Sequence, residues 1–242
     1  MIKRFDFLKK MASMISSDHL VVGYCIGLTS YEWWHLTRDW ENSVILGSMG
    51  CSTPLGVGLA LALPHRKVIV MDSDGSMLME PGILPVLGNI PVPNLTVVVL
   101  DNGAYESIGW KPNGERFKTY TAQNTDLAAM AKGAGIKNAF TIQTADEFEK
   151  RFSAALSGTE FSYLVVKTDQ QACQVPVKDI DAVEHKYRFV RYIEKTENVK
   201  IISLSSGRKY LFDKESFCSM TDGSSVGGKP SGTQDGTRTG RS

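Results

Sequence analysis

Short runs of apolar residues recur over the first 170 positions, and polar or glycine-containing segments separate them. The runs are rich in β-branched residues and do not alternate with polar positions, which is typical of strands covered on both faces. They predict strands at Leu20–Cys25, Ser43–Leu46, Lys67–Met71, Leu95–Leu100 and Ser162–Val166. Between them, helices are expected at Pro54–Leu63, Asp126–Gly133 and Asp146–Leu156. This alternation predicts the α/β fold class, with a doubly wound, mostly parallel sheet and helices on both faces.

The last 40 residues differ from the rest in composition. From position 203 to position 242, 20 of 40 residues are Gly, Ser or Thr. Such a segment buries too little apolar surface to offset the conformational entropy lost on ordering it. We therefore expect one folded domain over residues 1–202, followed by a flexible Gly/Ser/Thr-rich tail over residues 203–242.

Charge and cysteine content narrow the classes of protein that need considering. Twenty-seven basic and 26 acidic residues give a net charge of +1, which provides no general attraction to nucleic acid or to an anionic membrane. No apolar run is long enough to cross a bilayer, and the N-terminus lacks the apolar stretch of a signal peptide. The four cysteines are widely spaced, which is typical of thiols in a reducing compartment. A cytoplasmic location is expected.

Three predicted strands end in unusual polar or glycine-rich sequences. They are Gly47-Ser48-Met49-Gly50, Asp72-Ser73-Asp74-Gly75-Ser76 and Asp101-Asn102-Gly103-Ala104-Tyr105. In a parallel sheet all three lie on the same edge, where ligands of doubly wound folds bind. Glycines there let backbone N–H groups approach an anion closely, although a simple strand–helix turn has the same composition.

Asp74 and Asn102 supply hard oxygen atoms at the ends of successive predicted strands. Such oxygens suit Mg²⁺ or Ca²⁺, and Mg²⁺ commonly bridges a carboxylate to a phosphate. Each residue precedes a glycine, and Asp-Gly and Asn-Gly are also ordinary turn sequences. Their shared position beside a glycine loop favours a metal–diphosphate site.

The stretch from Asp74-Gly75-Ser76 to Asn102 resembles the diphosphate and Mg²⁺ motif of thiamine diphosphate-dependent enzymes. Gly47-Ser48-Met49-Gly50 resembles the loop that precedes this motif in the same family, and Gly27 to Glu32 resembles its first loop. The similarity covers roughly residues 15 to 175 and is greatest to the β subunit of sulfopyruvate decarboxylase and to phosphonopyruvate decarboxylase. Ser73 stands where the family has glycine, which would matter if the position needs a positive φ.

The resemblance implies a role for each matching residue. Asp74 and Asn102 would bind Mg²⁺ through their side chains, and Ala104 through its carbonyl oxygen. Met49 would lie under thiamine diphosphate and keep it bent, as a flexible and polarizable side chain can. The remaining implied cofactor-binding residues are Thr29, Ser30, Gly47, Ser48, Gly75, Ser76 and Tyr105.

The resemblance also implies that half of the enzyme is missing from this chain. Family members need a second domain that binds the aminopyrimidine and provides an activating Glu. The sequence contains only one α/β array, so this catalytic residue is expected on a pyrimidine-binding α subunit, and no catalytic residue is assigned here. The expected activity is that of a lyase, the decarboxylation of a small anionic 2-oxo acid of the sulfopyruvate or phosphonopyruvate class within a hetero-oligomer.

Several questions stay open at the level of the sequence. An acetolactate synthase-like carboligase subunit, or a noncatalytic diphosphate- or nucleotide-binding subunit, would share these motifs. Lys111, Arg116 and Lys118 form either a lid that binds the second anion of the substrate or a solvated basic loop. The tryptophans Trp33, Trp34 and Trp40 suit a subunit interface or the core equally well.

Overall fold

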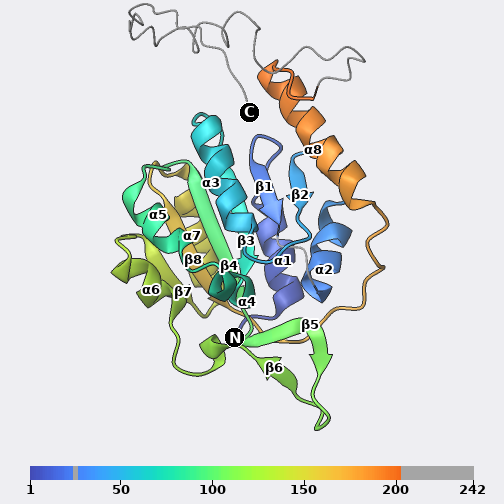
Figure 1. Cartoon of the computed structure of the whole chain (residues 1–242), viewed down its shortest axis with the longest axis vertical. Coiled ribbons are helices and arrows are strands. Elements are labelled where there is room, and N and C mark those ends of the chain that lie inside the picture. The colour runs from blue at the N-terminus through green and yellow to red at the C-terminus, as the bar shows by residue number, and fades with distance from the viewer. Residues whose placement is uncertain (24–26, 203–242) are drawn as a thin grey trace, which may run out of the picture. The chain divides into compact units, whose positions relative to one another are not determined.

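The computed structural model describes residues 1–23 and 27–202, and it contains a six-stranded sheet that is parallel throughout. The strand order is β2-β1-β3-β4-β8-β7 (Figure 1). The strands are β1 (Leu20–Gly23), β2 (Ser43–Ile45), β3 (Val68–Ser73), β4 (Leu95–Asp101), β7 (Ala139–Ile142) and β8 (Ser162–Lys167). The expectation of a parallel α/β sheet is confirmed.

Helices cover both faces of this sheet. They are α1 (Arg4–Ser13), α2 (Leu28–Thr37), α3 (Ser52–Ala62), α4 (Asp74–Met79), α5 (Ile83–Asn89), α6 (Leu127–Gly133), α7 (Ala145–Ser157) and α8 (Ala182–Glu197), with a 3-10 turn, η1 (Tyr120–Ala122). Polar side chains fix several helix starts, because an oxygen at the cap accepts from free N–H groups of the first turn. Asp126 caps α6 and Thr144 caps α7 in this way.

Successive strand residues face two separate apolar cores. Val68 and Val70 of β3 pack with helices α3, α5, α6 and α8. Ile69 and Met71 of the same strand pack with α1, α2 and α7 on the other face. Because strand side chains alternate between faces, a strand buried on both must be apolar at consecutive positions. This is why the strands were recognisable as continuous apolar runs.

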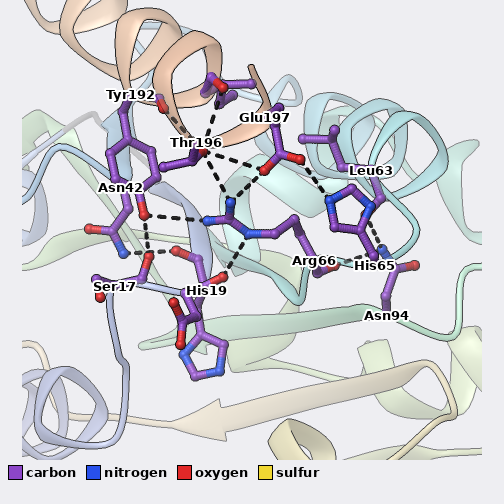
Figure 2. A network of polar contacts seen from close by, with 12 residues as sticks. Ser17, His19, Asn42, Leu63, His65, Arg66, Asn94, Tyr192, Thr196 and Glu197 are labelled. Carbon is purple, nitrogen blue, oxygen red and sulfur yellow. Dashed lines mark hydrogen bonds and ion pairs between the residues drawn. The ribbon is translucent and has the colours of Figure 1, made fainter. Parts of the chain in front are cut away.

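Helix α8 is fastened across the amino end of β3 by a polar network (Figure 2). Arg66 lies at its centre, with its guanidinium 2.5 Å from Glu197 and its Nε donating to the Asp18 carbonyl at 2.9 Å. Glu197 also contacts His65 at 2.7 Å, and the Tyr192 hydroxyl donates to the Ser17 carbonyl. This network is at the opposite end of β3 from Asp74.

The segment after β4 forms an antiparallel hairpin, β5 (Ala104–Trp110) and β6 (Arg116–Lys118), apart from the main sheet. Arg116 does not belong to a solvated loop, because it is only 9% exposed and its guanidinium stacks 3.7 Å from the Trp110 ring centroid. Trp33 and Trp34 lie in the core, with 0% and 6% exposure.

The predicted strands agree with the observed ones to within a few residues, with Tyr24 and Cys25 outside the described part of the chain. The predicted tail at 203–242 also lies outside it and stays a prediction. No helix among the described residues combines the length and apolar character needed to cross a membrane.

Candidate functional site

The polar strand ends of β3 and β4 meet in one pocket. The two strands are neighbours, and their last paired residues are Ser73 and Leu100. Asp74 and Asn102 follow directly and both line the pocket. Its other lining residues include Thr29, Met49, Gly75, Ala104, Tyr105 and Glu106.

Asp74, the first residue of α4, is a buried carboxylate with 1% exposure. Its Oδ2 accepts hydrogen bonds from Thr119 Oγ1 at 2.5 Å and from Thr121 Oγ1 at 2.9 Å. No ion pair to Asp74 is formed by residues 1–23 and 27–202. Burial, together with the charge of Asp101, raises the pKa of Asp74 to about 6 despite these hydroxyl donors. A buried carboxylate without a cationic partner fits a cation site.

Ser73 replaces the family glycine without strain. Its φ is −126°, so the backbone is extended and no left-handed conformation is needed. Its hydroxyl oxygen accepts from the Ser76 N–H at 3.2 Å and caps α4. At the next position, a Cβ on Gly75 would lie 2.7 Å from the Tyr105 ring, so a larger residue there would displace that ring.

The loop Gly47–Gly50 reaches the same pocket through Met49 alone. Gly50 has a φ of +77°, and its N–H donates to Ser76 Oγ at 2.8 Å. Met49 lines the pocket, and its Cε would be 3.5 Å from a Cβ on Gly75. Gly47 and Ser48 are exposed and do not line the pocket.

Asn102 is held at both ends of its side-chain amide. Oδ1 accepts from the Ala104 N–H at 2.9 Å, and Nδ2 donates to Glu106 Oε1 at 3.0 Å. Tyr105 lies between these two partners in sequence, and burial raises the pKa of its hydroxyl. The Asn102 amide is therefore immobilised at the pocket wall.

The first predicted loop contributes one residue to the pocket. Thr29 of α2 lines it, with Oγ1 3.5 Å from Glu106 Oε2. Ser30 is buried, but its hydroxyl donates to the Gly27 carbonyl at 2.8 Å and it is absent from the pocket lining. Of the predicted cofactor residues, the structure thus gathers most but not all around one pocket.

Four side chains at this site were not predicted from the sequence. Thr119 and Thr121 hold Asp74, and Glu106 and Arg4 line the pocket. Glu106 directly follows a motif residue, which was a usable signal. The two threonines lie 45 and 47 residues from Asp74, and nothing in their local sequence connects them to it.

The oxygen atoms available in this pocket suit a divalent cation that carries a diphosphate group. Asp74 has carboxylate oxygens, Asn102 an amide oxygen and Ala104 a backbone carbonyl oxygen, and all three residues line the pocket. Oxygen atoms of these three kinds are what Mg²⁺ prefers in proteins. The residues present therefore fit the metal and diphosphate group that the fold family uses.

Comparison with protein families then gives the class. Residues 22–166 match the profile of "Thiamine pyrophosphate enzyme, C-terminal TPP binding domain", a range that contains Asp74, Asn102 and the hairpin. The chain belongs to the family of thiamine pyrophosphate enzymes and carries their TPP-binding domain.

Two relatives indicate which members of that family this chain is similar to. The chain is 36% identical to the sulfopyruvate decarboxylase subunit beta of Methanocaldococcus jannaschii over 194 residues, which is 80% of this chain and 98% of that protein. It is 31% identical to the phosphonopyruvate decarboxylase of Streptomyces viridochromogenes over 154 residues, which is 64% of this chain and 36% of that protein.

Solved structures agree with the fold. The thiamine diphosphate-dependent 4-hydroxybenzoylformate decarboxylase of Rhodococcus jostii RHA1 superposes with a TM-score of 0.57 at 20% identity. The match covers 71% of this chain and 33% of that one. At this identity the likeness concerns the fold alone, and this chain spans about a third of that protein.

Proposed function

We propose that this chain is the diphosphate-binding β subunit of a thiamine diphosphate- and Mg²⁺-dependent 2-oxo acid decarboxylase. The substrate is of the sulfopyruvate or phosphonopyruvate class, and the products are an aldehyde and CO₂. The observation that carries the proposal is the meeting of Asp74 and Asn102 in one pocket at adjacent parallel strand ends. The near full-length match to a sulfopyruvate decarboxylase β subunit supports the substrate class and the need for a partner.

In this proposal each pocket residue has a binding role. Asp74, Asn102 and the carbonyl of Ala104 hold Mg²⁺, which neutralises the diphosphate. Thr119 and Thr121 fix the Asp74 carboxylate through Oδ2. Met49 and Tyr105 form the apolar part of the wall around Gly75. The other members of the proposed cofactor set are Thr29, Ser30, Gly47, Ser48 and Ser76.

Bound thiamine diphosphate supplies the electron sink for loss of CO₂. This chain's own residues hold and orient that group and keep water from one side of it. The activating Glu belongs to the pyrimidine-binding α subunit in this proposal, so the active site is completed by a second chain.

Replacing Asp74 tests the metal site directly. In the complex with its partner, Asp74→Ala should weaken Mg²⁺-dependent thiamine diphosphate binding by about 100-fold or more, because loss of one second-sphere group already costs roughly 10–100-fold in metal affinity. Isothermal titration calorimetry measures this. Asp126→Ala, which removes an exposed helix cap, is the control and should bind normally while losing about 1 kcal/mol of stability. Wild-type affinity in Asp74→Ala would refute the proposed site.

Product analysis decides between decarboxylation and carboligation. The chain also matches the acetolactate synthase large subunit of Buchnera aphidicola (Acyrthosiphon pisum) at 31% identity over 196 residues. Incubation of the complex with pyruvate, sulfopyruvate and phosphonopyruvate should give an aldehyde from one of the two dianionic acids. Acetolactate from pyruvate would establish the carboligase instead.

A further inference from the structure

A buried cluster of one arginine and two glutamates lies beside Asn102, and two of its members, Arg4 and Glu106, line the pocket. Arg4 of α1 is 1% exposed, Glu32 of α2 is 0% exposed and the Glu106 side chain of β5 is 7% exposed. Buried charges cost several kcal/mol each unless they are paired and hydrogen-bonded. A cluster of this kind in a pocket wall therefore calls for a reason beyond stability.

Arg4 holds the two carboxylates in fixed positions. Its Nε donates to Glu32 Oε2 at 2.8 Å and its Nη2 donates to Glu32 Oε1 at 3.1 Å, while Nη1 pairs with Glu106 Oε1. Glu32 Oε1 is further fixed by the Cys173 N–H at 2.6 Å. Burial by itself lowers the pKa of the guanidinium, but the hydrogen bonds and charges of Glu32 and Glu106 outweigh it and the pKa is raised. Arg4 is a permanent cation at this position.

Glu106, which is held by Arg4, in turn fixes the side-chain amide of Asn102. Its Oε1 accepts from Asn102 Nδ2 at 3.0 Å, while Asn102 Oδ1 accepts from the Ala104 N–H at 2.9 Å. The oxygen and nitrogen ends of an amide have almost the same shape, so packing alone does not choose between its two orientations. A carboxylate can only accept and a backbone N–H can only donate, so these partners allow one orientation. The reverse orientation would oppose two acceptors at one end and two donors at the other.

We infer that Glu106, anchored by Arg4 and Glu32, is a positioning residue that keeps the oxygen of Asn102 directed to the metal. The inference rests on the proposed function, because a hard divalent cation binds the amide oxygen and not the amide nitrogen. Glu106 is not itself one of the proposed metal ligands. The ion-pair cluster then serves metal affinity, in the way that outer groups orient the ligands of other metal sites.

The experiment measures Mg²⁺ affinity by calorimetry in the assembled complex with saturating thiamine diphosphate, and measures kcat at saturating Mg²⁺. Glu106→Ala should weaken Mg²⁺ binding about 10–100-fold, with kcat at saturation within about twofold of wild type. Glu106→Gln keeps an oxygen acceptor but loses the charge, so its affinity should lie between those of Glu106→Ala and wild type. Wild-type Mg²⁺ affinity in Glu106→Ala would overturn the inference.

A rescue at position 102 separates positioning from a merely structural role. A carboxylate presents oxygen at both ends and needs no orientation, so Asn102→Asp in the Glu106→Ala background should restore most of the lost Mg²⁺ affinity. In the wild-type background the same change sets two carboxylates against each other and should weaken binding. Failure of the double variant to bind better than Glu106→Ala would count against the positioning role.

The matched control is Glu197→Gln in the network around Arg66 (Figure 2). That ion pair is also largely buried, with 13% and 10% side-chain exposure, but it lies at the opposite end of β3. The control should lower thermal stability and leave Mg²⁺ affinity unchanged. Asp74→Ala distinguishes a failure of the positioning inference from a failure of the proposed function. If it abolishes binding while Glu106→Ala does not, only the positioning inference fails; if neither affects binding, the proposed function fails as well.

Discussion

The two ring nitrogens of the buried residue His185 have different surroundings, and the pKa of the ring is low. The residue lies on the buried face of α8 with 1% exposure, and its Nε2 donates to the Ser43 carbonyl at 3.1 Å. Nδ1 is buried and has no hydrogen-bond partner in the described part of the chain. Burial, followed by the charges of Arg188 and Lys178, lowers the pKa of His185 to about 4. The imidazole of His185 is therefore neutral in the folded protein at pH 7.

The stability of the protein should therefore fall as pH is lowered from 6.5 to 4. An unfolded histidine has a pKa of about 6.5, so in this range the unfolded chain binds the additional proton and folding loses about 2–3 kcal/mol from this group. Urea unfolding at pH 7 and at pH 4.5 should show a larger loss for the wild type than for His185→Gln. An equal loss in the two proteins would contradict the assigned pKa, whatever other groups contribute.

At the scale of elements, helix α3 is held close to β3 by a glycine. A Cβ on Gly56 would lie 2.1 Å from Cγ2 of Val70, whereas a Cβ on Gly58 of the same helix would meet nothing within 4 Å. The contact leaves no room for even one methyl group, because Val70 is a fully buried, β-branched strand residue.

Gly56→Ala should lower the free energy of unfolding by about 1–3 kcal/mol, the usual cost of overpacking a core. Gly58→Ala is the matched control and should raise it by up to about 1 kcal/mol, because alanine loses less backbone entropy in a helix. Chemical denaturation of the two variants measures both effects. Similar values for both would mean that α3 can move away from the sheet at no cost.

The same scale explains how much of the fold the sequence predicted. Central strands were found because burial on both faces makes every position apolar, as at Val97–Val99. The edge strand β7 and the hairpin β5–β6 were missed because their residues are only partly buried and follow no continuous apolar pattern. Helices α1, α2, α4, α5 and α8 were also missed, and residues 28–32 of the expected first loop belong to α2. In α8 a signal was present, because Phe189 and Ile193 lie one helical turn apart on its buried face.

Residues of the site could be predicted from the sequence only where they directly follow a predicted strand. Asp74 and Asn102 each follow a strand in sequence, so the parallel topology brought them together, and their role in binding metal is still a prediction. The partners of Asp74 and Asn102 depend on tertiary contacts between distant segments, such as Thr119 with Asp74 and Arg4 with Glu106. No local pattern of residues encodes such contacts.

At the scale of the whole molecule, the strand order explains where the pocket lies. From β1 the chain adds β2 on one side and then returns to add β3 on the other, so the order changes direction beside β1. Loops leaving the strand ends diverge at such a point and open a crevice. The pocket lies there, lined by residues that follow β1, β3 and β4, among them Thr29, Asp74 and Asn102.

We expect the isolated chain to have no measurable decarboxylase activity, because the group that activates the cofactor is proposed to lie on the α subunit. Activity should appear on adding that subunit and saturate at a fixed ratio of the two chains. Titration of one purified subunit with the other, followed by CO₂ release, measures this. Full turnover by the chain alone would refute the division of the site.

The N-terminal segment that carries the pocket residue Arg4 is held by the far end of the described domain. Ile2 pairs with Thr168, and the Arg4 N–H donates to Asp169 across 165 positions of sequence. During synthesis the N-terminal residues leave the ribosome first, so Arg4 cannot be enclosed until residue 169 has emerged. A nascent chain stalled before that point would already carry Asp74 and Asn102 but not the finished wall beside them. The N-terminal segment therefore reaches its final place only once the chain through residue 169 has been synthesised.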